Sequence, residues 1–374
     1  MTDSAVGHSP ENGNGPQTGP GNGAETGTGT SPESGTGTGA GVDVGRSVPT
    51  VAPTGTQHTI AAGGYRAVLT EVGAGIRSLT YDDRPLLMDY PAGQPAVGGA
   101  GQLLLPWPNR VEDGRYDFDG QTRQLAITEP RAGHATHGFT RWLPWTVLAE
   151  NATSIRFRLR LFPQLGYPHV LDLTAAYSVS PAGLEVEVSA TNVGASAAPY
   201  GMGAHPYLTL GTGHVDDAVD DAVLGLPAAQ WLEVDDRKIP IARHGVEGTD
   251  YDFRTARPVG GLALDTPFTG LRRDADGLVR VRLRSADASV DGSADGSADG
   301  AHGVELWAGD GIEWLQVYTG DTLPDGYRRA GIAVEPMSCP PNAFATGEDL
   351  IRLTPGDHVS HRWGVRAWPD SARA

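Results

Sequence analysis

Apolar and polar residues alternate with a period of two along several stretches of the chain. In SIRFRLRLF, which starts at Ser154, isoleucine, phenylalanine and leucine alternate with arginine. The stretches LEVEVSA (184–190) and LVRVRLRS (278–285) repeat the pattern with glutamate or arginine at the polar positions. Such alternation is typical of antiparallel strands that have one buried and one solvated face. These stretches therefore predict β-strands, and no apolar stripe of helical period and convincing length accompanies them.

Two segments of biased composition interrupt this pattern. Residues 1–56 consist mostly of Gly, Thr, Ser, Pro, Asn and Glu, and the first aromatic residue is Tyr65. Such a segment cannot bury enough apolar surface to offset the entropy lost on ordering, so we expect a disordered tail. The segment 286–303 contains DGSADGSADG and predicts a flexible loop inserted between two strands. Residues 57–369 predict one large all-β domain, an antiparallel β-sandwich.

The composition excludes several classes of function. The formal net charge of −17 argues against nucleic acids and anionic membranes as partners. Cys339 is the sole cysteine, which excludes an intrachain disulfide and a cysteine-based zinc site. No apolar run approaches the roughly 18 residues of a membrane span, and the N-terminus lacks the features of a signal peptide. We therefore expect a soluble cytoplasmic protein. Lys238 is the only lysine, which we attribute to codon usage in a GC-rich genome rather than to chemistry.

Ionisable and aromatic side chains gather in four places along the sequence. One of them is AGIAVEPMSCPP, where Glu335 precedes Pro336. Because proline cannot donate to a sheet ladder, we expect Glu335 where its strand ends, at a sheet edge or mouth. Functional residues are common at such positions. The other three places contain Asn109 and Arg110; His134, His137, Arg141, Trp142 and Trp145; and His205.

Each of these residues also has a purely structural interpretation. Arg110 could pair with a neighbouring surface carboxylate, and His134 and His137 could be loop histidines bound to backbone groups. Their spacing of three, like that of His358 and His361, could also indicate a metal site. On extended backbone, however, that spacing puts two side chains on opposite faces, and no HExxH frame is present. We expect no metal site.

The remaining inventory favours proton transfer on a neutral polar ligand. The chain has no serine-nucleophile elbow, no acidic cluster typical of a magnesium site and no glycine pattern of a dinucleotide fold. Trp142 and Trp145 are interpreted as packing residues. A sugar offers hydroxyls to arginine, histidine and aspartate, and its C–H face can lie on an aromatic ring. A carbohydrate is therefore the predicted ligand.

Five short motifs in order give a more specific indication. They are Asn109-Arg110, His137-Gly138, His205-Pro206-Tyr207, Asp265 in LDTPF, and Glu335-Pro336. With these motifs the chain resembles the aldose 1-epimerase (galactose mutarotase) family from about Ala67 to Trp363. GAGIRSL and LTPGDHVSHRWGV are similar to the opening and closing strands of that family.

The resemblance implies a galactose mutarotase-like supersandwich that binds one aldose in a cleft and interconverts its α and β anomers. It implies Glu335 as general base and His205 as general acid toward the ring oxygen. His205 is then expected to be protonated at rest, with a pKa raised by a nearby carboxylate. No cofactor or metal is needed. Sugar-binding roles are implied for Arg110, His137 and Asp265, with Asn109 beside them.

Two rival functions remain on the same fold. A hexose-phosphate 1-epimerase would need additional cations over the pocket, and Arg141 is one possible contributor, although the sequence shows no cluster. A non-catalytic sugar-binding protein would not need an acid/base pair, so the presence of both His205 and Glu335 argues against it. The segment GHAT before His137 departs from the family pattern. The sequence leaves the preferred aldose and the oligomeric state open.

Overall fold

The computed structural model describes residues 50–211, 215–286 and 302–369. The tail predicted for residues 1–56 and the loop predicted for 286–303 lie largely outside these ranges, and both stay predictions. Within the ranges the chain is built from β-strands, which confirms the all-β class, and no helix there is long and apolar enough to cross a membrane. The helical pieces described are α1 (Ala343–Thr346) and the 3₁₀ turns η1 (Val97–Gly99), η2 (Glu112–Gly114) and η3 (Thr140–Trp142).

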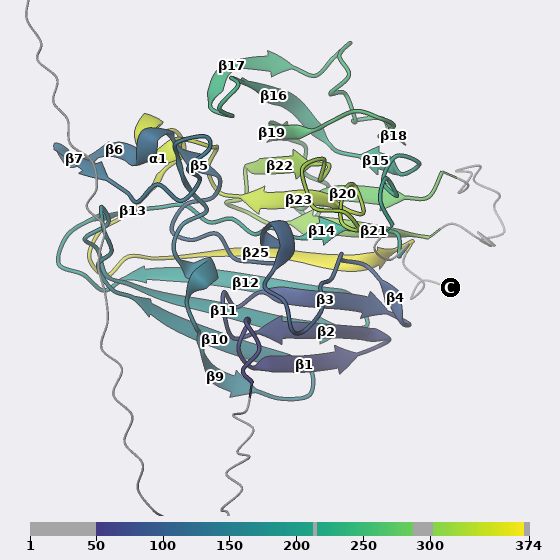
Figure 1. Ribbon diagram of the computed structural model, residues 1–374, viewed down its shortest axis with the longest axis horizontal. Helices are drawn as coiled ribbons and strands as arrows, with labels where there is room; N and C mark the ends of the chain where they lie inside the picture. Colours follow the sequence, from purple (N-terminus) through teal and green to yellow (C-terminus); the bar gives the residue numbers. More distant parts are fainter. Residues whose placement is uncertain (1–49, 212–214, 287–301, 370–374) are drawn as a thin grey trace, which may run out of the picture. The chain divides into compact units, whose positions relative to one another are not determined.

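The largest sheet has nine antiparallel strands (Figure 1). The three stretches of alternating residues all form strands of this sheet. Val279, Val281 and Leu283 are buried, whereas the arginines between them are half-buried, as the period of two predicts. In spatial order its strands are β18 (Arg257–Pro258), β15 (Val223–Gly225), β20 (Val279–Arg284), β21 (Gly303–Ala308), β25 (His358–Trp368), β12 (Gly183–Asn192), β11 (Leu171–Ser180), β10 (Ser154–Leu161) and β9 (Thr146–Glu150).

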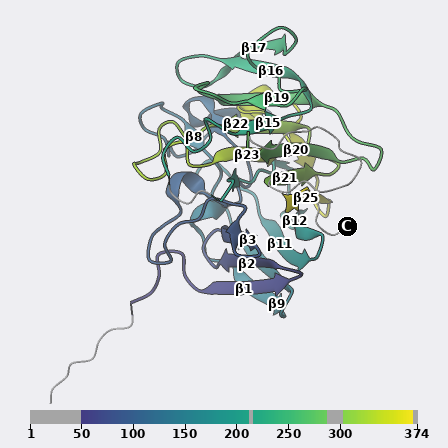
Figure 2. The same cartoon turned by 90° about the vertical axis from the view of Figure 1, so that its right-hand side faces the viewer.

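Two further sheets complete the main framework. The six-stranded sheet has the order β14 (Tyr207–Leu208), β23 (Ile332–Met337), β22 (Trp314–Tyr318), β19 (Asp265–Leu271), β16 (Ala228–Val234) and β17 (Pro240–Gly245). The four-stranded sheet has the order β1 (Gln57–Ala62), β2 (Tyr65–Thr70), β3 (Ile76–Tyr81) and β4 (Arg84–Pro85). Strands β1 and β2 pack on β11, and Figures 1 and 2 both show these strands side by side. The four-stranded sheet thus covers part of the nine-stranded sheet.

Three two-stranded ladders extend this framework. One of them, β5 with β8, carries cleft residues. The ladders are β5 (Arg110–Val111) with β8 (Ala135–Thr136), β6 (Arg115–Phe118) with β7 (Gln121–Gln124), and β13 (Ala198–Tyr200) with β24 (Ile351–Leu353).

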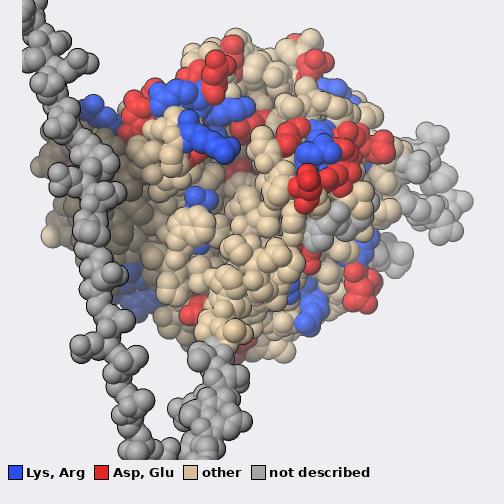
Figure 3. Space-filling model, in the orientation of Figure 1, with Lys and Arg blue, Asp and Glu red and all other residues tan. Residues whose placement is uncertain are grey.

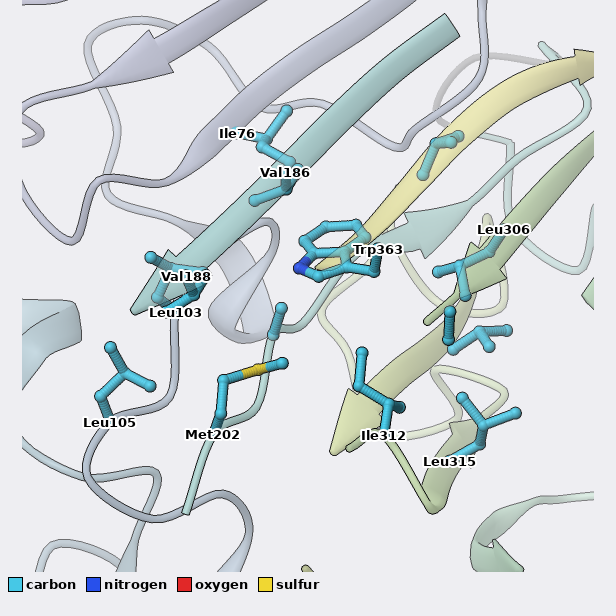
Figure 4. Close-up of a cluster of buried hydrophobic side chains, with 14 of the residues drawn as sticks. Ile76, Leu103, Leu105, Val186, Val188, Met202, Leu306, Ile312, Leu315 and Trp363 are labelled. Carbon is cyan, nitrogen blue, oxygen red and sulfur yellow. The ribbon is translucent and has the colours of Figure 1, made fainter. Parts of the chain in front are cut away.

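A hydrophobic core joins strands from all three large sheets. Figure 4 shows Trp363 of β25 within a cluster that also contains Ile76 of β3 and Val186 of β12. Leu306 of β21 and Leu315 of β22 belong to the same cluster, and both are fully buried. Burying such a side chain contributes about 1.5–3 kcal/mol. The strands that carry the site are therefore anchored by apolar packing.

Charged side chains of both signs lie next to one another on the surface. On the face shown in Figure 3, blue and red side chains are interspersed, and no broad basic area is visible there. Arg160 pairs with Asp172 at 2.7 Å, and Arg362 pairs with Glu185 at 2.7 Å. On this face the basic side chains do not form a surface that would attract a polyanion.

Gly101 connects β3 to the segment that carries His205. Its backbone N–H donates to the His205 carbonyl at 2.9 Å, and its own carbonyl accepts from the Ile76 N–H at 2.9 Å. Gly101 has a φ of +71°, and a Cβ there would lie 1.9 Å from the Ile76 oxygen. Only glycine fits this position without displacing the backbone.

We expect Gly101→Ala to lower the free energy of unfolding by about 2–5 kcal/mol, because the cost of a left-handed backbone conformation adds to the cost of the steric clash. Gly120→Ala is the matched control, since Gly120 has a φ of +72° with no atom within 4 Å of the added Cβ. That variant should lose only about 1–2 kcal/mol. Urea unfolding measures both changes, and equal losses would contradict the close approach at Gly101.

Candidate functional site

A cleft of about 560 Å³ brings together the six residues predicted to act in catalysis or sugar binding. This volume is typical of a site for one small molecule. The residues come from positions more than two hundred apart in the chain, so only the folded domain assembles them. The six are Asn109, Arg110, His137, His205, Asp265 and Glu335.

The six-stranded sheet supplies the two acidic members. Glu335 lies in β23 opposite Gln316 of β22, and Asp265 begins β19 opposite Tyr318 of β22. Directly opposed residues of antiparallel strands share a face, so all four side chains lie on the same side of the sheet. The prediction that Glu335 ends its strand is wrong, because β23 continues through Pro336 to Met337.

His205 and Glu335 form a buried contact in the cleft. The Nε2 atom of His205 lies 3.3 Å from Oε1 of Glu335, and their side chains are only 7% and 3% exposed. Within the described residues, Nδ1 of His205 and Oε2 of Glu335 have no hydrogen-bond partner. Both groups therefore retain capacity to bind a ligand that enters the cleft.

Burial controls the protonation of this pair. It raises the pKa of Glu335 well above its ordinary value, an effect that Asp265 strengthens and Arg110 opposes. Burial lowers the pKa of His205 to about 3. The expectation that His205 has a raised pKa and is protonated at rest is therefore wrong: desolvation of the imidazolium lowers its pKa, and the charge of Arg141 adds to this effect. The resting pair favours a neutral His205 beside a protonated Glu335.

Asn109 and His137 face each other at the end of the β5–β8 ladder. The His137 N–H donates to the Asn109 carbonyl at 2.9 Å, and the Asn109 N–H donates to Nδ1 of His137 at 3.1 Å. Both residues have positive φ, +52° and +60°, which is uncommon outside glycine. Because Nδ1 accepts a hydrogen bond, the ring proton of neutral His137 lies on Nε2.

Arg110 belongs to a charged network inside the cleft. Its guanidinium donates to both oxygens of Glu129, at 2.8 and 3.0 Å, and lies 3.9 Å from Asp265. Its carboxylate partners are therefore not Glu112 and Asp113, the sequence neighbours considered in the structural interpretation. Asp265 also accepts from the Gln316 amide at 2.7 Å. These contacts fix the carboxylate and guanidinium that line the cleft.

Several cleft residues were missed in the sequence. Tyr207 stacks on His205 with ring centroids 4.9 Å apart, and its hydroxyl donates to the Gly98 carbonyl at 3.0 Å. It could have been found, since it belongs to the His-Pro-Tyr motif. Glu129, which lines the cleft, and Gln316, which binds Asp265, belong to no motif. Lys238 also lines the cleft, with Nζ 3.5 Å from Asp265. No chemical role was predicted for this single lysine from the sequence.

The other aromatic and histidine residues have structural roles. Trp145 is buried in the core, whereas Trp142 is 58% exposed. His134 is buried; its Nδ1 accepts from the Asp113 N–H, and its Nε2 contacts the Arg237 carbonyl. His361 is buried while His358 is exposed, as expected for a spacing of three on a strand. In the described part of the chain, no group of three or more His, Cys, Asp or Glu residues could hold a metal ion.

Comparison with known proteins identifies the family. A sequence model of the aldose 1-epimerase family matches residues 56–366. The chain belongs to the aldose 1-epimerase family. It is 35% identical over 304 residues to the uncharacterized protein YihR of Escherichia coli K12, a match that covers 81% of this chain and 90% of YihR.

Solved structures of aldose 1-epimerase relatives share the fold. A Caenorhabditis elegans homologue of GalM and aldose epimerases has a TM-score of 0.71 at 20% identity, with 83% of this chain and 98% of that one covered. The galactose 1-epimerase of Lactobacillus acidophilus has a TM-score of 0.64 at 18% identity, with 82% and 92% covered. These similarities confirm the galactose mutarotase-like sandwich.

The Asn109 contact predicts the tautomer of His137. We expect the ring to stay neutral, with its proton on Nε2, to a pH well below the ordinary histidine pKa of 6.5, because burial lowers its pKa. Nitrogen-15 NMR of the imidazole can measure both properties. A proton on Nδ1, or titration near pH 6.5, would contradict the arrangement.

Proposed function

We propose that this protein is an aldose 1-epimerase that interconverts the α and β anomers of a hexopyranose. The observation that carries the proposal is the contact between His205 and Glu335, 3.3 Å apart within the cleft. An acid and a base at one point suit a reaction that removes one proton and delivers another. Membership of the aldose 1-epimerase family supports the same reaction class.

Two proton transfers open the sugar ring. In the proposed role, the Glu335 carboxylate takes the proton of the C1 hydroxyl while the His205 imidazolium gives a proton to the ring oxygen. The C1–ring-oxygen bond breaks, and its electron pair stays on the ring oxygen, while the C1 oxygen forms the aldehyde carbonyl. Rotation about the C1–C2 bond and the reverse transfers close the other anomer. Each such group typically contributes about 10²–10⁴-fold to the rate.

The reactive state requires the pair to exchange its proton. At rest, burial favours the proton on Glu335, whereas the reaction begins with the proton on His205. Both forms contain one proton, so transfer across the contact interconverts them without exchange with solvent. Arg110, whose positive charge opposes the rise in the Glu335 pKa, stabilises the carboxylate that this transfer creates.

The remaining cleft residues suit recognition of hydroxyl groups. Asp265 offers acceptors, whereas Arg110 and the Nε2–H of His137 offer donors. Asn109 orients His137 through the backbone hydrogen bonds described above. Other protein groups hold each of these side chains in place, so they are already oriented for binding when a ligand enters.

The acid/base pair favours this function over non-catalytic sugar binding. Burying a carboxyl group and an imidazole with unmet hydrogen-bonding capacity costs free energy. Recognition of a neutral sugar needs no such pair, whereas epimerisation depends on it. The free-energy cost of burying the pair is therefore expected for an epimerase and not for a protein that only binds sugar.

We expect Glu335→Gln to reduce the maximal rate by about 10²–10⁴-fold with little change in KM, because the amide cannot take the proton. The rate can be followed by coupling anomer conversion to a dehydrogenase specific for the β anomer. Arg110→Ala is the comparison variant, and it should raise KM in addition to lowering the rate. An inactive wild type would sink the proposal, and nearly full activity in Glu335→Gln would refute this residue as the base.

The rate should also depend on pH through the pair. The acid limb of kcat/KM records a second proton, which must bind His205, so it should lie well below the ordinary value of 6.5. The alkaline limb records loss of the last proton from Glu335 and should lie well above the ordinary value of 4.5. A pH profile of kcat/KM measures both limbs. An acid limb near pH 6.5 would contradict the lowered pKa of His205.

A further inference from the structure

Arg141 is the cleft-lining cation that has no carboxylate partner among the described residues. Arg110 is held by Glu129 and Asp265, and Lys238 lies 3.5 Å from Asp265. Arg141 lines the same cleft, yet no Asp or Glu oxygen of the described chain lies within 4.0 Å of its guanidinium. No carboxylate of the described residues therefore pairs directly with its charge.

The guanidinium is also partly removed from water. Its Nε atom is buried and has no hydrogen-bond partner in the described part of the chain. Burial lowers the pKa of Arg141 to about 10, and the charge of Glu129 acts against this shift. Glu129 cannot serve as a full partner because both of its oxygens accept from Arg110. Partial burial of a guanidinium whose Nε has no hydrogen-bond partner is costly, and a bound anion would reduce that cost.

The position of this charge is set by its neighbours. Arg141 lies in η3, directly before Trp142, and its guanidinium stacks 4.6 Å from the Trp142 ring. Its positive charge contributes to the lowered pKa values of both His137 and His205. The unmatched cation therefore lies on the histidine side of the cleft, near the reaction centre.

We propose that Arg141 binds an anionic substituent of the sugar, so that the preferred substrate is a negatively charged aldose. This inference rests on the proposed epimerase function. The charged group cannot be on C1, because the reaction requires a free C1 hydroxyl. The exocyclic C6 position carries a carboxylate, a phosphate ester or a sulfate ester without blocking ring opening. All three present oxygen atoms that a guanidinium fork can bind in a bidentate manner.

The experiment compares matched pairs of neutral and charged sugars. Glucose is paired with glucose 6-phosphate, with glucose 6-sulfate and with glucuronate, and anomer exchange is measured by NMR above the protein-free rate. We expect kcat/KM for at least one charged sugar to exceed that for glucose by about 10- to 100-fold, the range of a charge-assisted hydrogen bond. The three charged sugars distinguish the three substituents.

Variants of Arg141 assign the preference to this side chain. Arg141→Gln should bring the ratio of kcat/KM for the preferred charged sugar to kcat/KM for glucose close to one, and Arg141→Lys should keep part of the preference. The ratio is the readout because the charge of Arg141 also acts on His205 and so affects both sugars. Arg131→Gln is the matched control: it removes an exposed arginine from the loop next to Glu129, outside the residues that line the cleft. It should leave the preference intact.

Three outcomes separate the inference from the proposed function. Equal kcat/KM for charged and neutral sugars in the wild type would overturn the inference and leave the epimerase intact. An equal loss on both sugar types in Arg141→Gln would mean that Arg141 binds sugar hydroxyls, which also overturns it. No exchange above the protein-free rate with any of the four sugars would overturn the proposed function, and the inference with it.

Discussion

The buried contact between His205 and Glu335 is the constraint on which the rest of the site depends. Two ionisable groups at 3.3 Å, nearly removed from water, share one proton, which gives either a neutral pair or an ion pair, so they titrate as one unit. Desolvation sets where that proton rests, and the charges of Asp265 and Arg110 adjust it in opposite directions. The protonation states of His205 and Glu335 therefore depend on their burial as much as on the residue types.

The fold maintains this contact with elements that are distant in the sequence. Glu335 is held opposite Gln316 by the pairing of β23 with β22, whereas His205 is held by backbone bonds to Gln102 and Gly101. The absence of a side chain at Gly101 lets β3 and the His205 segment meet through their backbones. The ring of His137 lies 5.5 Å from that of His205 between centroids. Both Asn109 and His137 adopt positive φ, a strain that is common where function fixes a side chain.

The fold and the residues that line the cleft could be predicted from the sequence better than the protonation and charge pairing of those residues. Strands such as β20 follow from strict alternation, and the six cleft residues follow from ordered motifs. The position of Glu335 within its strand was missed because Pro336 suggested a strand end. The Pro336 carbonyl accepts from the Ala204 N–H, on the edge of β23 that lies beyond the short β14. The N–H that proline lacks would point to this same edge, so the pairing of β23 with β22 on the other edge is unaffected. Lys238 and Glu129 have no motif, and only tertiary structure reveals the unmatched charge of Arg141.

We infer from its burial that the His205–Glu335 pair holds its proton on Glu335 at rest. An infrared difference spectrum between the wild type and Glu335→Gln, recorded near neutral pH without sugar, can detect that proton. We expect the wild type to show the carbonyl band of a protonated carboxyl group that is absent from the variant. A carboxylate band from Glu335, with no protonated carboxyl signal, would contradict it.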